Sequence, residues 1–253
     1  MLLCHFFSDP TNTFLISDMG IVFGMTGVEE PKYTLLQSTP FEIRAYPKYM
    51  MAQVEMSASD DPNDKSAFRV LAKYIGVYGE AENEGRRSIA TAAPRISGSG
   101  TGSGEKMAMT APVVRSGQYM GFVLPFEYVN IADVPRPTDS RIQLIEVPER
   151  VVACRAFSGY YTQDIGRAQF RELNAQLMAA DLVPKPAADS SSSSSSANGS
   201  NNENNNVEDM KWQCAQYHPP FTLPFMRRNE VWVELNEVMP SVRTLLQKLR
   251  NVK

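Results

Sequence analysis

Hydrophobic and polar positions follow the same plan in two separate parts of the chain. Segments 41–52 and 142–153 each read as a strand, a proline-led turn and a second strand, and they align with an offset of 101 residues. A helical pattern follows in each part, with Phe68 matching Phe170 at an offset of 102. Two further strands end each copy. The alignment places them at 107–112 and 119–124 in the first copy, and at 213–219 and 230–235 in the second.

This repeat predicts an α+β fold with pseudo-two-fold symmetry. Each half, 32–125 and 140–236, is a ββαββ unit, and one half covers the apolar face that the other exposes. We expect the strands to form a curved, largely antiparallel sheet or open barrel with the two helices packed on it. Ligands of such folds bind in the concave groove or between elements, which makes the groove a candidate site.

A short duplication leaves two candidates for one core strand. Segment 89–94 resembles segment 107–112, but Arg95 interrupts the first while Val113 and Val114 continue the second as an apolar run. We therefore assign the strand to 107–114 and expect 89–94 to be an exposed hairpin or loop.

Composition shifts divide the chain into one domain with extensions. No Lys or Arg precedes Lys32, so residues 1–18 fit neither a secretory signal nor a transit peptide, and we expect them to be disordered. A single domain is predicted at 19–236. Its Ser/Asn-rich insert, about 187–208, cannot bury enough apolar surface to order itself. The C-terminal extension, 237–253, is compatible with a helix.

Charge and composition exclude several classes of protein. The formal net charge of −3 gives no basic field for nucleic acid, and no apolar run reaches the roughly 18 residues of a membrane span. Three cysteines make no disulfide framework, and two histidines rule out a His-rich zinc cluster. We expect a protein of the cytoplasm, without nucleic-acid binding or stable membrane insertion.

Catalytic motifs are not found in the sequence. It contains no GxSxG, no GxGxxG and no Walker signature, and its cysteines have no recognisable partner motif. The prediction is a binding protein and not an enzyme. Two alternatives stay open: a small-molecule hydrolase that uses the same cleft, with a carboxylate such as Glu55 or Glu146 as acid or base, and a protein-interaction module.

The first helix has a mixed shoulder beside its apolar face. Phe68, Ala72 and Lys65 lie together there at about 100° per residue, between the apolar stripe and the exposed side. An apolar surface next to a cation suits a flat hydrophobic acid. The alternative is that Phe68 completes the core and that Lys65 is solvated.

Several ordered motifs resemble the SOUL/haem-binding protein family, most closely its plant and algal cytosolic branch. The resemblance covers Met19 to about Leu235 apart from the Ser/Asn insert. It rests on the motifs MGIVFG at 19–24, PKY at 31–33, FEIRAY at 41–46, LAKYIG at 71–76, KMAMTAPV at 106–113, PRPTD at 135–139, YHPPFTLP at 217–224 and RNEVW at 228–232.

The resemblance implies non-catalytic binding of a tetrapyrrole, haem or protoporphyrin, by a cytosolic carrier or buffer. By position, the family's porphyrin surface corresponds to the first helix and to the loop 221–228. The candidate binding residues are Lys65, Phe68, Arg69, Ala72, Phe221, Arg227 and Arg228. Burial of the apolar ring drives such binding, and cations at its rim pair with the propionates. Arg227 and Arg228 have an alternative role as a solvated turn or as a structural pair that supports Glu230.

Two positions depart from the family pattern. Ala45 stands where some members have His, and His218 stands where relatives usually have Asn or Asp. We therefore expect His218 to be a hydrogen-bonded residue at the end of a strand. Met107 and Met109 are expected to fill the core. The tetrapyrrole is accordingly expected to bind without strong axial ligation of iron.

Overall fold

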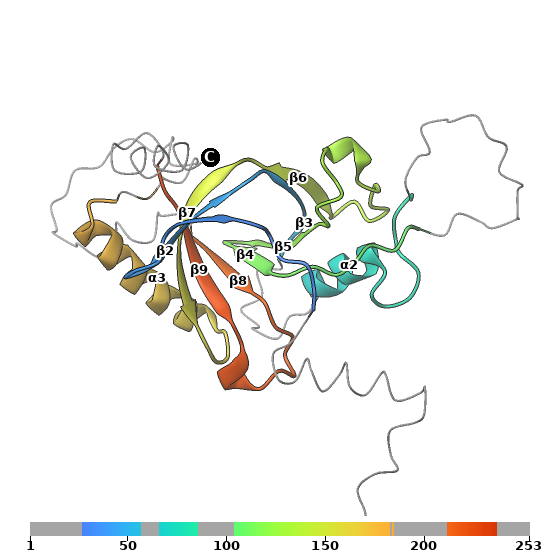
Figure 1. The fold of residues 1–253 in the computed structure, drawn as a ribbon. Helices are drawn as coiled ribbons and strands as arrows, with labels where there is room; N and C mark the ends of the chain where they lie inside the picture. The colour runs from blue at the N-terminus through green and yellow to red at the C-terminus, as the bar shows by residue number, and fades with distance from the viewer. Residues whose placement is uncertain (1–26, 57–65, 86–103, 183, 185–211, 237–253) are drawn as a thin grey trace, which may run out of the picture.

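The structure is a computed structural model that describes residues 27–56, 66–85, 104–182, 184 and 212–236 (Figure 1). The expected terminal extensions, the insert at 187–208, the segment 89–94 and Lys65 lie outside the described residues. The first half contains β1 (Thr34–Gln37), β2 (Glu42–Tyr46), β3 (Tyr49–Glu55), α2 (Ser66–Ile75), β4 (Val113–Ser116) and β5 (Tyr119–Val123). After the short helix η2 (Ile131–Asp133), the second half contains β6 (Gln143–Val147), β7 (Arg150–Phe157), α3 (Gln163–Ala179), β8 (Trp212–Gln216), η3 (Pro224–Met226) and β9 (Asn229–Glu234).

The described strands form one antiparallel sheet in the order β1-β2-β7-β9-β8-β4-β5-β3-β6. Read outward from its centre, β4-β5-β3-β6 mirrors β8-β9-β7-β2, so the sheet has the predicted pseudo-two-fold symmetry. The axis passes the pair Val114–Ala215, which lie opposite each other and 101 residues apart. Strands β2 and β6, which are equivalent in the two repeats, each pair with a strand of the other half, and this exchange links the two repeats.

Two short connections force this sheet to curl. Strands β2 and β3 lie six places apart in the sheet, about 29 Å if it were flat, yet only Pro47 and Lys48 join them. That link spans at most about 11 Å. Pro148 and Glu149 impose the same constraint on β6 and β7. The sheet must therefore bend into the half-barrel that was predicted from the repeat (Figure 1).

Each helix covers one half of the sheet and buries its own core. Leu71 of α2 is fully buried against β3 and β5, and α2 ends at Gly76, whose positive φ of 84° favours glycine. Helix α3 begins at Thr162, whose side chain accepts a hydrogen bond from the backbone N–H of Ile165. Its Leu173, the repeat equivalent of Leu71, is fully buried against β7 and β9.

The predicted strand at 107–112 was wrong by several residues. Thr110 makes only an isolated bridge with Glu29, and β4 runs from Val113 to Ser116. Val114 pairs with Ala215, so the structural offset in this strand is 101. The sequence alignment had instead matched Ala and Pro of 107–112 with Ala and Pro of 213–219, an offset of 107 that the strand pairing does not follow. The last strands, β5 and β9, align as predicted, with Tyr119 opposite Glu55 and Glu230 opposite Ala156.

The inside of the curl is filled with side chains, which corrects the expectation of a ligand in the concave groove. A third buried cluster occupies it, on the face of the sheet away from the helices. It contains Tyr46, Tyr49, Met51, Ala111, Val114, Val123, Val147, Val152, Cys154, Ala215, Tyr217 and Trp232. The inner face of the curl therefore leaves no groove for a large ligand among the described residues.

Candidate functional site

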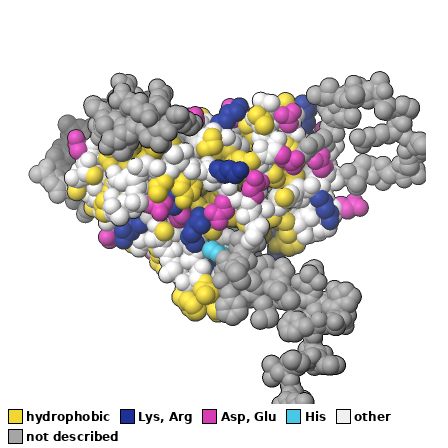
Figure 2. All heavy atoms as spheres, viewed as in Figure 1, with side chains coloured by type: hydrophobic (Ala, Val, Ile, Leu, Met, Phe, Trp, Pro, Cys, Tyr) yellow, Lys and Arg dark blue, Asp and Glu magenta, His cyan; other side chains and the backbone are white. Residues whose placement is uncertain are grey.

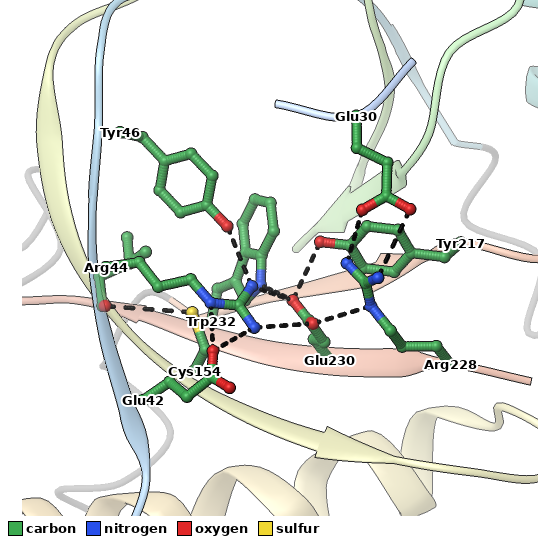
Figure 3. A network of polar contacts seen from close by, with 10 residues as sticks. Glu30, Glu42, Arg44, Tyr46, Cys154, Tyr217, Arg228, Glu230 and Trp232 are labelled. Carbon is green, nitrogen blue, oxygen red and sulfur yellow. Dashed lines mark hydrogen bonds and ion pairs between the residues drawn. The ribbon is translucent and has the colours of Figure 1, made fainter. Parts of the chain in front are cut away.

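One buried carboxylate organises the polar contacts inside the curl (Figure 3). Glu230 of β9 is 1% exposed and receives two hydrogen bonds from the guanidinium of Arg44 on β2, at 2.8 and 3.1 Å. It also accepts hydrogen bonds from Tyr217 Oη at 3.0 Å, Trp232 Nε1 at 2.7 Å and Arg228 Nε at 3.0 Å. This carboxylate thus joins β2, β9 and the end of β8.

Glu230 is charged in this setting because its partners outweigh its burial. Burial opposes ionisation, but the hydrogen bonds and charge of Arg44, with help from Trp232 and Arg228, hold the pKa of Glu230 below its ordinary value. Removing one partner of such a pair leaves a buried charge uncompensated. We assign the Arg44–Glu230 pair a structural role: it fixes the sheet next to the loop that follows β8.

That loop, residues 217–228, has no counterpart in the first half. Gly117 and Gln118 alone connect β4 to β5, whereas twelve residues connect β8 to β9. The base of the loop is closed by Tyr217 N–H, which donates to Arg228 O at 3.2 Å, and by Arg228 N–H, which donates to His218 Nδ1 at 3.0 Å. Because only one of the two repeats has this long loop, its side chains are candidates for a functional role.

The loop holds large apolar side chains in solvent. Phe221 and Phe225 are 62% and 70% exposed, Met226 is also exposed, and the neighbouring Tyr160 is 61% exposed. We call these four residues the aromatic patch. The loop is tied to the residue before Tyr160 by the hydrogen bond from Gly159 N–H to Pro224 O at 2.8 Å. Figure 2 shows a hydrophobic cluster at this lower edge of the molecule, next to the histidine, which is His218 among the described residues.

The two predicted arginines have different surroundings. Arg227 lies over the ring of Tyr160 at 4.4 Å and donates to the backbone carbonyls of Thr222, at 2.8 Å, and Pro220, so its cation is held within the aromatic patch. Arg228 pairs with Glu230, which is the structural alternative stated above, and also with Glu30 at 2.8 Å.

The predicted residues of the first helix are spread around α2. Phe68 is half-buried against Phe122, with ring centroids 5.3 Å apart, and Ala72 is fully buried in the core. Arg69 is exposed. The sequence pattern placed Phe68 and Ala72 on one shoulder with Lys65, but Ala72 has no surface to offer a ligand.

A hollow of about 550 Å³ lies at the start of α2, on another side of the helix from Phe68 and Ala72. It is lined by Ser66, Ala67 and Val70 of α2, by Val54, Glu55 and Met56 at the end of β3, and by Ser140, Arg141 and Gln143. Arg141 is paired there with Asp139 at 2.6 Å. Among the predicted residues that the structure describes, the loop group joins exposed aromatic surface with a fixed cation, whereas no fixed cation is found beside Phe68.

The surroundings of His218 bear on iron binding. Because Nδ1 accepts the Arg228 N–H, a neutral His218 carries its own proton on Nε2, which leaves no nitrogen lone pair free for a metal in this arrangement. The prediction of a hydrogen-bonded strand-end histidine is confirmed. Met107 is buried and Met109 packs against the core of the first half, as expected. No group of three or more His, Cys, Asp or Glu able to hold a metal ion occurs in the described part of the chain.

The sequence did not reveal the buried network around Arg44 and Glu230, or part of the aromatic patch. Arg44 was quoted only as a letter of a family motif, and Glu230 only as a residue that Arg227 and Arg228 could support, although a charged residue inside a strand of apolar neighbours signals a buried pair. Tyr160 was not predicted, and Phe225 and Met226 were included only through the loop range 221–228. The dense proline content of 219–224 was the available signal, because it favours a loop that cannot fold back on its own side chains.

The family model described as SOUL heme-binding protein matches residues 28–101 and 95–234. Together these segments cover most of the chain, and the protein therefore belongs to the SOUL heme-binding family. Among curated protein sequences, none matches the chain.

Solved structures with a similar fold are distant in sequence. An uncharacterized conserved protein from Listeria innocua has a TM-score of 0.43 and 10% identity over 84% of this chain and 95% of its own. The C-terminal domain of EcmrR has a TM-score of 0.41 and 8% identity over 81% and 98%. A hydrolase from Listeria innocua has a TM-score of 0.41 and 10% identity over 78% and 91%. Likenesses at this level say nothing about function.

Within the described residues, no helix has the length and apolar character needed to cross a membrane.

Proposed function

We propose that this protein binds haem or protoporphyrin without catalysis and serves as a cytoplasmic carrier or buffer of tetrapyrroles. Membership of the SOUL heme-binding family supports the ligand class. The observation that carries the proposal is the aromatic patch with Arg227 fixed inside it. Phe221 and Phe225 are exposed on a loop held by backbone hydrogen bonds, one of which joins it to Gly159, the residue before the exposed Tyr160.

The residues of the patch fit a tetrapyrrole by their chemistry. The ring is a large apolar plate, and each aromatic side chain covered by it contributes about 1.5–3 kcal/mol of hydrophobic free energy. Arg227 offers a guanidinium to a propionate and is already oriented by Tyr160 and Thr222. From the first helix, Lys65, Phe68 and Arg69 remain candidates for a second contact, whereas Ala72 would need the core to open.

The bound group supplies a planar ring and, with iron, a redox centre; the chain's own residues orient it and shield one face. Since Nδ1 of His218 is engaged by Arg228, we propose that iron receives no strong axial ligand and that ring burial dominates the affinity. Haem and metal-free protoporphyrin should then bind similarly.

The test is a titration of the purified protein with hemin and with protoporphyrin, followed by the Soret band and by tryptophan fluorescence. We expect saturable binding of both ligands with dissociation constants within about threefold of each other, a difference below about 0.7 kcal/mol. No spectral change up to about 10 μM ligand would contradict the proposal.

The hydrolase alternative lacks a supporting nucleophile among the described cysteines. Cys154 and Cys214 are both buried. Burial raises the pKa of Cys214 to about 12 and that of Cys154 well above its ordinary value, so neither thiol ionises at neutral pH. The interaction-module alternative concerns the insert, which lies outside the described residues, or the second helix, α3, and stays a prediction.

A further inference from the structure

Arg228 has two carboxylate partners of opposite character. Its Nε donates to Glu230, which is 1% exposed and bound on all sides by the buried network. Its outer edge, Nη1 and Nη2, faces Glu30, at 3.4 and 2.8 Å, and both side chains of this pair are 37% exposed (Figure 3). The contact with Glu230 is shielded from solvent, whereas the contact with Glu30 is accessible to water and to other carboxylates.

The guanidinium would keep its orientation without Glu30. It lies over the ring of Tyr217 at 3.5 Å, and the hydrogen bond to Glu230 fixes its inner edge. The outer Nη1–Nη2 edge of an arginine can bind a carboxylate through two parallel hydrogen bonds. Glu30 therefore occupies a preformed carboxylate position.

Breaking the Arg228–Glu30 ion pair costs little free energy. Exposed ion pairs contribute weakly, and losing one changes an equilibrium by about fivefold or less. The charge on Arg228 is well retained, because neighbouring Tyr217, Glu230 and Glu30 outweigh burial and raise the pKa of its guanidinium.

The carboxylate position adjoins the aromatic patch. Arg228 directly follows Arg227, whose guanidinium lies over Tyr160 of the patch, and its backbone N–H donates to His218 at the base of the same loop. A ligand seated on the patch would have to extend past Arg227 to reach Arg228.

We propose that Glu30 is a built-in competitor for the ligand: a propionate of the bound tetrapyrrole takes its place on the outer edge of Arg228. This inference rests on the proposed function. It makes the site selective for ring systems that carry free carboxylates, and it gives the segment 27–31 control over affinity.

A matched ligand pair tests the proposal. Deuteroporphyrin and its dimethyl ester share one ring, but only the first carries carboxylates. In the Glu30→Gln variant we expect the affinity for the diacid to rise about threefold to fivefold, because the competitor has lost its charge, while the affinity for the ester changes less than about 1.5-fold. Glu42→Gln is the control, since Glu42 is a similarly exposed carboxylate, 38%, paired with Arg44 on the same network. It should change neither affinity.

Equal changes for the two porphyrins, or a weaker diacid affinity in Glu30→Gln, would overturn the inference and leave the proposed function standing. A second readout does not depend on porphyrin binding. In ¹⁵N-arginine-labelled protein titrated with sodium propionate at constant ionic strength, the Arg228 Nε–H signal should shift at lower propionate in Glu30→Gln than in the native protein. Coincident propionate curves for the two proteins would refute the carboxylate position itself. If the propionate curves are separated but porphyrin does not bind, only the proposed function is refuted.

Discussion

Tyr49 and Arg150 occupy equivalent positions in the two repeats, 101 residues apart, and they contact each other: Arg150 Nη2 donates to Tyr49 Oη at 2.7 Å inside the curl. Arg150 also lies over the ring of Trp232 at 5.7 Å and is 6% exposed. The same position thus carries an aromatic residue in one repeat and a cation in the other, so the two copies complement each other where they meet.

Loss of this contact should destabilise the fold in a coupled way. A hydrogen bond to a charged group contributes about 1.5–3 kcal/mol, so we expect Tyr49→Phe and Arg150→Met each to lower the free energy of unfolding by about that amount. In urea titrations the double variant should lose at least about 1 kcal/mol less than the sum of the single variants. Additive losses would mean that the two side chains act independently.

The buried Glu230 predicts a specific pH dependence. Its pKa is lowered in the folded protein, so its stabilising contribution is present above the unfolded value, about 4.3, and is lost as pH falls through the lower folded value. We expect Glu230→Gln to reduce the free energy of unfolding by about 3–5 kcal/mol at pH 7, because the buried Arg44 then keeps only the partly exposed Glu42 as an ion-pair partner. The difference from the native protein should shrink as pH falls below the unfolded pKa of about 4.3 and through the lower folded pKa. A difference that stays constant over this range would show that Glu230 is not the group that titrates.

The equivalent phenylalanines of the two helices should differ in their effect on stability. Phe170 is 1% exposed and stacks on Trp212 with ring centroids 5.6 Å apart, whereas Phe68 is only half-buried. Phe170→Ala should cost about 3–5 kcal/mol and Phe68→Ala about half as much or less, measured by urea unfolding. Equal losses would contradict the accessible setting of Phe68.

The architecture could be predicted because each repeat shows its strands and helix in the pattern of neighbouring hydrophobic and polar residues. The strand–proline–strand units at 41–52 and 142–153 and the helices after them are each specified by neighbouring residues. The exchange of β2 and β6 between the halves could not be predicted, because pairing partners about ninety or more residues apart leave no local signal. The misplaced strand at 107–112 shows the same limit: its apolar alternation fits a strand, but only the pairing of Val114 with Ala215 fixes the register.

The site was predictable in part for a related reason. Family motifs pointed to Phe221, Arg227 and Arg228, but their roles depend on residues that the chain brings from far away. Glu30 lies 198 residues before Arg228, and Arg44 lies 186 residues before Glu230. The sequence likewise could not reveal that the concave groove is filled, since that depends on side-chain volumes from both repeats.

The aromatic patch is the central claim, and a porphyrin titration of a patch variant tests it most directly. Phe221→Ser combined with Phe225→Ser removes two exposed rings. The control combines Val129→Ser with Met178→Ser, at side chains 59% and 60% exposed elsewhere on the surface. Both proteins should keep the native melting temperature. We predict that the patch variant binds protoporphyrin at least about tenfold more weakly, since each covered ring contributes about 1.5–3 kcal/mol, while the control binds like the native protein. Native affinity in the patch variant would contradict the account.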